Sequence, residues 1–237
     1  MLAYILIIFF AALVQGMTSF GFSLLAMPFL TFFMPLQLIV PILVVCSLCL
    51  NCIIFFQLKG QLYIKRMILM LIVGIVSTPI GVELLTLVDE KHLKFCVGSL
   101  IIISALIMFK GIHFRFSNKQ ITYIITGFMS GVLNGSVSLS GPPVVLMFVN
   151  EGQEKETFRK NISGYFLTLN IFTIPSFFAK GLLTHEVITY SGIGIVALSI
   201  GAIIGVNVSE GIDELKFKRL VLMMIMGMGL MTIISIF

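Results

Sequence analysis

The stretch Gly135–Pro143, which reads GSVSLSGPP, lies inside one of the most hydrophobic parts of a very hydrophobic chain. It contains two glycines, three serines and two adjacent prolines. Glycine and proline destabilise helix interiors, and serine competes for backbone hydrogen bonds. The stretch therefore predicts an interruption in the middle of an apolar segment, at a depth where helix breaks are costly.

The composition indicates an integral membrane protein. Of 237 residues, 59% are hydrophobic and only 11% are charged, whereas a soluble domain carries roughly 25% charged residues. The apolar runs are long and lack two-residue alternation, as in Met67–Val88. This pattern favours membrane helices over a β-barrel. The net charge of +5 agrees with basic loops beside membrane helices and is no sign of nucleic-acid binding.

Charged loops divide the chain into eight apolar blocks. Most are about as long as the 20 or so residues that cross a bilayer as a helix, but the first and fifth are longer and are interrupted by Gly, Ser and Thr. The blocks are 2–34, 38–58, 67–88, 93–110, 121–150, 162–179, 187–208 and 219–237.

The two halves of the chain resemble copies of one unit. Gly16–Leu30, GMTSFGFSLLAMPFL, aligns with Gly131–Val145, GVLNGSVSLSGPPVV, at an offset of 115. This alignment pairs Ser23 with Ser138 and Pro28 with Pro143. Later matches follow in the same order at offsets of 121 and 124. We therefore predict two membrane repeats, residues 1–115 and 116–237.

Charge indicates that the two long blocks double back. If each crossed the membrane once, the 15 Lys and Arg residues would divide 7 to 8 between the two sides. If each is a hairpin, they divide 12 to 3, which agrees with the excess of positive charge in cytoplasmic loops. Each repeat is then a hairpin of two short helices followed by three transmembrane helices. The odd number of passes inserts the second repeat upside down, as in many secondary transporters.

The hairpin tips are predicted to meet near the middle of the membrane. Arms of about 10–13 residues extend about 15–20 Å into a hydrocarbon core about 30 Å thick. The tips are Gln15–Ser23 and Asn134–Pro143. Non-helical backbone at this depth must be covered by protein or line a polar cavity. A helix that begins there presents unpaired amides and a positive dipole end, which together favour an anion.

The two tip motifs also carry a family resemblance. The sequence resembles the sulfite exporter TauE/SafE family, on GMTSFGFSLLAMPFL and GVLNGSVSLSGPPVVLMF. The resemblance covers the whole chain, although only these motifs are specific. It implies transport of sulfite or other small sulfur-containing anions. The first copy has Ala26-Met27 where the second has Gly141-Pro142, so the two tips are not expected to contribute equally.

The candidate substrate-binding residues lie at the tips and on the span that follows each hairpin. They supply hydroxyl and amide groups or allow close backbone approach. Glu83 is an acid within an apolar span and is a candidate for proton coupling, or else it lies at the outer interface. The predicted binding residues are Gln15, Thr18, Ser19, Gly21, Ser23, Asn51, Asn134, Gly135, Ser136, Ser138, Ser140, Gly141, Pro142 and Asn170.

No enzyme motif is evident, and the sequence predicts neither a cofactor nor a metal centre. The predicted function is secondary transport of a small anion, sulfite or an organosulfonate, by alternating access at the membrane midplane. A passive anion channel is one alternative. A thiol-dependent sulfur or soft-metal transporter using Cys46, Cys49 and Cys52 is another, although those cysteines also suit simple packing.

The expected location is the cell membrane, with both termini outside. The expected partners are a small anion and the lipid bilayer, with no nucleic acid, and a homodimer is left open. The sequence does not indicate which anion is carried, in which direction, or with which coupling ion.

Overall fold

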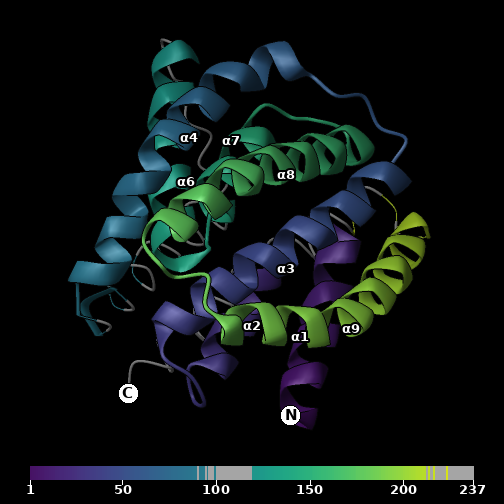
Figure 1. Cartoon of the computed structure of the whole chain (residues 1–237). Coiled ribbons are helices and arrows are strands. Elements are labelled where there is room, and N and C mark those ends of the chain that lie inside the picture. Colours follow the sequence, from purple (N-terminus) through teal and green to yellow (C-terminus); the bar gives the residue numbers. More distant parts are fainter. Residues whose placement is uncertain are drawn as a thin grey trace.

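The protein is all-helical throughout the part described by the computed structural model, which covers residues 1–89, 91–93, 95, 99, 119–211, 213, 216 and 223 (Figure 1). The predicted spans 93–110 and 219–237 lie almost wholly outside these residues. The helices are α1 (Leu2–Thr18), α2 (Phe22–Leu30), α3 (Leu36–Gln57), α4 (Ile64–Leu87), α6 (Lys119–Val137), α7 (Gly141–Asn150), α8 (Lys155–Ala179) and α9 (His185–Glu210).

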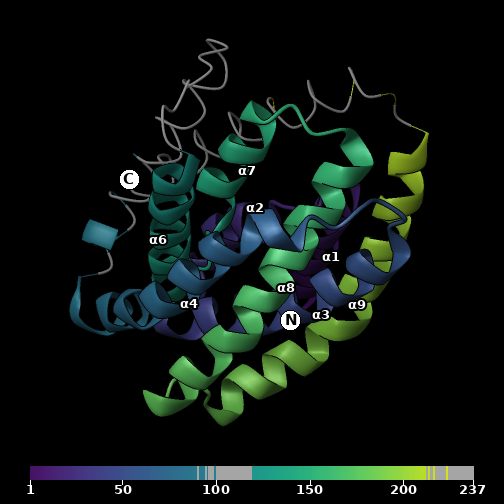
Figure 2. The same ribbon diagram turned by 90° about the horizontal axis from the view of Figure 1, so that it is seen from above.

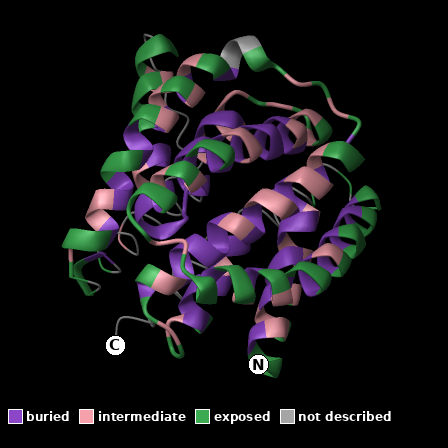
Figure 3. Cartoon of the chain, viewed as in Figure 1, coloured by how far each residue is buried: buried purple, intermediate pink, exposed green. Residues whose placement is uncertain are grey.

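Four of these helices, among the described residues, are long and apolar enough to cross a membrane: α3, α4 from Met67 onward, α8 and α9. On α4 the apolar side chains of Ile68, Ile72, Val76 and Ile80 follow one another every four residues, and each is about half exposed or more. Figure 3 shows such exposed positions along the outer surfaces of α4 and α9. Since these side chains suit contact with lipid, the prediction of an all-α membrane protein is confirmed.

Both long apolar blocks are broken where the sequence predicted. The first block stops being helical at Ser19, where φ is +67°, and resumes after Gly21, where φ is +101°. Glycine adopts this conformation without steric cost, which is why it suits the residue before α2. The second block breaks at Ser138, where φ is +56°. Each block is thus two helices rather than one continuous rod.

The arms of each pair differ in length, although the sequence predicted short arms of similar length, about 10–13 residues each. The first arms, α1 and α6, have 17 and 19 residues, whereas α2 and α7 have only 9 and 10. The glycines and serines early in each motif do not end the helix, because they lie against neighbouring helices. The helix ends only at the later residues of each motif, Ser19 in the first and Ser138 in the second. The first arm of each pair is therefore longer than predicted.

The chain reverses direction between α6 and α7. The hydroxyl of Ser130 donates to the carbonyl oxygen of Ser140 at 3.1 Å. The hydroxyl of Tyr123, near the start of α6, donates to Glu151 Oε1, just after α7, at 2.7 Å. These two contacts place α7 antiparallel to α6. In the first pair, the Phe22 amide at the start of α2 returns to Gln15 Oε1 on α1 at 3.0 Å.

Two close helix pairs flank the centre of the molecule. The helix α1 packs against α9, and α4 packs against α6, with α3 and α8 between the two pairs (Figures 1 and 2). Glycines allow this close approach. A Cβ atom at Gly131 would lie 2.1 Å from the Gly74 carbonyl oxygen, and one at Gly205 would lie 2.2 Å from the Leu13 carbonyl oxygen. Each half of the chain thus packs its hairpin against a helix of the other half.

Matching positions in the two halves are 119 residues apart at the tips, not 115. The helix ends Thr18 and Val137 share this spacing, as do the two left-handed serines, Ser19 and Ser138. The sequence alignment was displaced by about one helical turn, because glycines recur along both motifs at a helical spacing. Residues 23 and 138, which that alignment treated as equivalent, are instead in contact with each other.

The helix α8 begins seven residues before the apolar block 162–179 that predicted it. Its first turns, Lys155–Asn161, are charged and polar but remain helical, with Glu156 at the favourable N-terminal end. Lys155 donates to the Ser209 carbonyl, and Lys160 donates to the Leu58 carbonyl at 2.8 Å. These contacts gather the start of α8 and the ends of α3 and α9 at one end of the molecule, which we call the basic end.

Candidate functional site

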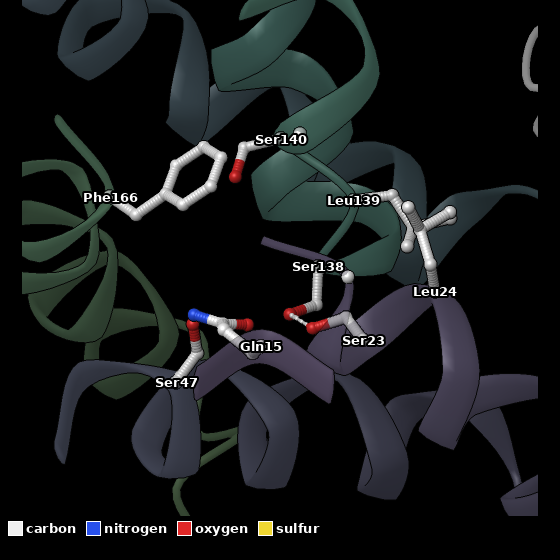
Figure 4. A pocket seen from close by; sticks show the side chains of 10 residues that line it. Gln15, Ser23, Leu24, Ser47, Ser138, Leu139, Ser140 and Phe166 are labelled. Atoms are coloured by element: carbon white, nitrogen blue, oxygen red, sulfur yellow. Dashed lines mark hydrogen bonds between the residues drawn. The ribbon is translucent and has the colours of Figure 1, made fainter. Parts of the chain in front are cut away.

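A small polar cavity lies where the two tips meet, and we call it the central cavity (Figure 4). Its volume is about 20 Å³, which is room for about one water molecule. The hairpins and the two central helices, α3 and α8, all contribute to its wall. The lining residues are Gln15, Gly21, Ser23, Leu24, Ser47, Ser138, Leu139, Ser140, Gly141 and Phe166.

The tips touch through two serine hydroxyls. Ser23 Oγ lies 3.0 Å from Ser138 Oγ, and both side chains are buried. Figure 4 shows this pair on the wall of the central cavity. Either hydroxyl can donate to the other, so the hydroxyl that accepts keeps its own hydrogen free to donate to a ligand. This contact confirms the prediction that the two tips lie against each other.

A chain of buried amides supports the cavity from behind. Gln15 Nε2 donates to Asn51 Oδ1 at 3.0 Å, and Asn134 Nδ2 donates to Asn170 Oδ1 at 3.0 Å. Both pairs are 36 residues apart, one in each half. Asn51 and Asn170 both donate to the hydroxyl of Ser47, at 3.0 and 3.2 Å. The side chains of both hairpins are thus joined through α3 and α8.

The two short helices present different numbers of amides to the cavity. The first four N–H groups of a helix lack partners within it. In α2 these belong to Gly21, Phe22, Ser23 and Leu24, of which Phe22 donates to Gln15. In α7 two of the four positions are the prolines 142 and 143, which have no N–H. The first tip therefore offers more amide donors, although the prolines drew attention to the second.

An aromatic ring covers the start of α7. The Phe166 side chain, from α8, is 5% exposed and lines the central cavity. A Cβ atom at Gly141 would lie 3.8 Å from the tip of this ring, and Figure 4 shows the ring directed toward Ser140. The matching position in α3 is Ser47, which is small and polar. The cavity is therefore bulky and apolar on the α8 side and polar on the α3 side.

Several predicted binding residues lie near the cavity but do not line it. Thr18 Oγ1 lies 2.9 Å from the Val14 carbonyl oxygen and 2.7 Å from the Phe20 carbonyl oxygen, so its one hydrogen is donated to the backbone at the end of α1. Ser19 is fully buried, and its hydroxyl has no hydrogen-bond partner among the described residues. Pro142 occupies the first turn of α7. Asn51, Asn134 and Asn170 belong to the supporting amide chain.

Gly135 and Ser136 face another helix. A Cβ atom at Gly135 would lie 2.4 Å from the Thr78 carbonyl oxygen on α4. Ser136 donates to the Val132 carbonyl at 2.7 Å, and its amide nitrogen would lie 3.0 Å from a Cβ atom at Gly81. Both residues therefore contribute to packing between α4 and α6 in this arrangement.

Glu83 lies away from the central cavity, in an ion pair with Lys180. The two side chains are 43% and 44% exposed, so the acid is not enclosed in the protein interior. It joins the far ends of α4 and α8, opposite the basic end. This placement agrees with the interfacial alternative, and its part in proton coupling stays a prediction.

The cysteines of α3 also lie outside the cavity wall. Cys46 is buried, whereas Cys49 and Cys52 are partly buried, and all three are free thiols. A Cβ atom at Gly194 on α9 would lie 3.6 Å from the Cys46 sulfur. Among the described residues, no group of three or more His, Cys, Asp or Glu side chains is placed to hold a metal ion. Cys96 lies outside the described residues.

Sequence reasoning missed three residues around the site. Ser47 lies one turn before Asn51 on α3, and this spacing was a usable signal. Phe166 gave no signal, because an aromatic residue in a membrane helix is ordinary. Arg159 was counted as a loop cation, yet it is fully buried within α8 and donates to the Gly16 carbonyl at 2.8 Å.

Comparison with known proteins decides the family. The profile of the sulfite exporter TauE/SafE family matches residues 4–232, nearly the whole chain. The chain belongs to this family. As a TauE/SafE protein it is a multi-pass membrane transporter of sulfur-containing anions. No curated protein and no solved structure matches the chain. The motifs that carried the resemblance are the ones that form the two tips.

Proposed function

We propose that this TauE/SafE protein is a secondary transporter of sulfite or a small organosulfonate, which it binds in the central cavity between the hairpin tips. The main support for this proposal is that the starts of α2 and α7 both reach this cavity, at Gly21 and Gly141. A helix start contributes roughly half a positive charge together with its free amides. None of the described residues that line the wall carries a full positive charge, so the anion is held by dipoles and can be released.

Hydroxyl groups complete the binding site. Ser23, Ser138 and Ser140 line the cavity. The hydroxyl of Ser19, which has no partner among the described residues, lies at the first tip, as Ser23 does. Together with the α2 amides they supply donors for the three oxygens of a sulfite or sulfonate group. The apolar side chains of Leu24 and Phe166 suit the carbon of an organosulfonate.

The arrangement described here corresponds to a closed state. The central cavity has room for about one water molecule, which is less than a sulfite ion occupies. Ser23 and Ser138 must separate, or Phe166 must turn away, before the anion enters. We propose that the two repeats, residues 1–115 and 116–237, move against each other to open the cavity to each side in turn. The matching 119-residue spacing at the tips supports two equivalent repeats.

Binding and transport by the purified protein test the proposal. Thermal unfolding is measured with sulfite, methanesulfonate, acetate and sulfate, since a ligand that binds only the folded state raises the melting temperature. We expect sulfite or methanesulfonate to raise it, and S138A/S140A to reduce that shift. S199A, which changes a partly exposed serine on α9 that does not line the cavity, is the matched control. If none of the four anions gives a shift, or if S138A/S140A responds like the wild type, this binding site is refuted.

A passive channel is the first alternative. The tips touch through Ser23 and Ser138, and the cavity between them has room for about one water molecule, which favours a carrier. Flux in liposomes separates the two mechanisms. A carrier saturates with sulfite and shows accelerated exchange when sulfite is present on both sides, whereas a channel does neither.

A thiol-dependent transporter is the second alternative. Cys46, Cys49 and Cys52 lie on α3 outside the cavity wall, which favours a packing role. Loss of sulfite transport in C46A/C49A/C52A, with folding retained, would support the thiol mechanism instead.

The proposed orientation in the cell membrane places both termini outside and the basic end inside. The positive-inside rule supports it, with Lys155 and Lys160 at the basic end and Lys180 at the other. Single cysteines at Met1 and Pro35, in a background free of native cysteines, should react with a membrane-impermeant maleimide in intact cells. Labelling of either position only after lysis would contradict this orientation.

Proton coupling through Glu83 has its own test. If Glu83 carries the coupling proton, E83Q loses transport driven by a pH gradient but keeps sulfite exchange. K180Q is the matched control for loss of the ion pair alone. Equal pH-driven transport by E83Q and the wild type would remove Glu83 from the mechanism.

A further inference from the structure

A fully buried arginine lies between the central cavity and the basic end. Arg159, in the second turn of α8, is 0% exposed. Its Nη2 donates to the Gly16 carbonyl at 2.8 Å, and its Nη1 donates to Glu156 Oε1 at 3.3 Å. Its Nε has no hydrogen-bond partner within the described part of the chain. Burying an unpaired donor of a charged group is costly, so this one needs an explanation.

The unpaired donor lies on a specific edge of the guanidinium group. Nε and Nη2 form one edge of the planar fork, which suits two oxygens of a single carboxylate, phosphate or sulfonate group. In Arg159 one prong of this edge contacts the Gly16 carbonyl and the other is empty. A carbonyl has one oxygen and accepts from only one of the two nitrogens, whereas an oxyanion would accept hydrogen bonds from both Nε and Nη2.

A second unpaired group lies one turn further along the same helix. Ser163 is fully buried, and its hydroxyl has no hydrogen-bond partner among the residues that the structure describes. Residues 159, 163 and 166 share one face of α8. Phe166 lines the central cavity, about 10 Å along the helix from Arg159. Two unused donors therefore follow each other from the cavity toward the basic end.

We propose that Arg159 and Ser163 form a second oxyanion-binding site, which holds the sulfite or sulfonate group between the central cavity and the basic end. This inference rests on the proposed function. When the anion arrives, the Nε and Nη2 edge of Arg159 exchanges the Gly16 carbonyl for two anion oxygens, and Ser163 donates to the anion. Release of Gly16 frees the last turn of α1, so occupation of this site loosens the first tip.

Glu156 makes the site reversible. Its carboxylate is 48% exposed and pairs with Nη1, on the other side of the fork. It offsets part of the arginine charge while leaving the Nε and Nη2 edge open. An anion held there competes with a partly solvated carboxylate, so it can leave toward the basic end. A site with the full charge of an unpaired arginine would retain the anion too tightly for transport.

The decisive variant is S163A. It removes a hydroxyl that forms no hydrogen bond to any described residue, so a purely structural role predicts an unchanged or slightly higher melting temperature and normal transport. Our proposal predicts that sulfite transport in proteoliposomes falls about tenfold, the effect of one hydrogen bond to a charged group. S191A, which removes another buried hydroxyl, one that lies on α9 away from the cavity wall, is the matched control and should transport normally.

The R159K variant is a second test of this site. Lysine keeps the charge but cannot bind two oxygens in one plane. We expect R159K and S163A to keep the sulfite-induced thermal shift from the central cavity while transport falls in both. If R159K does not fold, S163A alone decides.

Three outcomes would overturn the second site. Normal transport by S163A would refute it and leave the central site intact. Loss of the thermal shift in S163A would place Ser163 in the central site. A wild-type protein that neither binds nor transports sulfite or methanesulfonate would refute the proposed function and this site with it.

Discussion

The two hairpins have the same framework but differ at the position where an anion would bind. Each first arm carries a buried amide side chain, Gln15 or Asn134, that bonds an asparagine 36 residues later. Each tip turns at a left-handed serine. Beyond that serine, however, α2 keeps its backbone amides, whereas α7 has prolines at its second and third positions, and its first residue, Gly141, lies near the ring of Phe166.

This difference suggests that the two tips have different roles in binding the anion. The first tip supplies amide donors and is held by Arg159 from the basic end. The second tip is rigid, since proline fixes the backbone of its first turn, and it supplies hydroxyls from Ser138 and Ser140. We infer that the first tip binds the anion and moves, while the second tip forms a fixed wall.

The largest expected effect comes from breaking the amide chain on one side. N51L removes the acceptor of Gln15 Nε2, whereas after N170L the Asn134 amide still donates to Thr173 Oγ1. We expect N51L to lower the free energy of unfolding by about 2 kcal/mol, because it leaves a buried donor unpaired, and N170L by about 1 kcal/mol. Denaturation of both variants in the same detergent measures the difference. Equal losses would mean that the two hairpins are supported alike.

The next effect comes from transferring the prolines of α7 to α2. S23P/L24P places prolines at the positions matching Pro142 and Pro143, and it removes two amide donors while the first helical turn tolerates proline. We expect the dissociation constant for sulfite to rise about tenfold. S23A and L24A, measured by calorimetric titration alongside it, account for the lost side chains. Unchanged affinity beyond those two controls would remove the α2 amides from the site.

A smaller effect is expected from the ring over α7. F166L shortens the side chain while keeping it apolar, and we expect a loss of stability of about 1 kcal/mol. The enlarged cavity should improve transport of ethanesulfonate relative to methanesulfonate by about fivefold, since one methylene in an apolar pocket is worth about 1 kcal/mol. Competition assays in proteoliposomes give this ratio. An unchanged ratio would indicate that Phe166 does not face the substrate.

The smallest effect is expected from the thiols of α3. C46A/C49A/C52A removes side chains that lie outside the central cavity, so the transport rate should change less than about twofold, although loss of the buried Cys46 side chain lowers stability by about 1 kcal/mol. Rates are compared at equal amounts of folded protein in the liposomes. A loss of most of the activity would support the thiol mechanism.

The sequence predicted the features that depend on local chemistry. Gly21, Ser138 and the paired prolines mark the breaks, and loop charge made hairpins the better interpretation. It did not predict which face of each motif would be the cavity. Gly135 and Ser136 were assigned to the site, but they lie against α4 because contacts from Thr78 and Gly81 occupy that face.

Long-range packing explains the remaining differences. The cavity wall includes Ser47 and Phe166, which are far from both motifs in sequence and become neighbours only when α3 and α8 cross between the helix pairs. Arg159 was not recognised because the charged start of a membrane helix normally lies in the headgroup region. Its burial depends on the end of α1 reaching as far as Gly16 beside α8.

The most direct test of the account is to locate a bound anion. Selenite has the shape and charge of sulfite, and selenium is identified in a crystal by its anomalous scattering. The account predicts a selenium peak between the tips, within hydrogen-bonding reach of the Ser23 and Leu24 amides and the Ser138 hydroxyl. A peak elsewhere, with Ser23 and Ser138 still in contact and nothing between them, would contradict it.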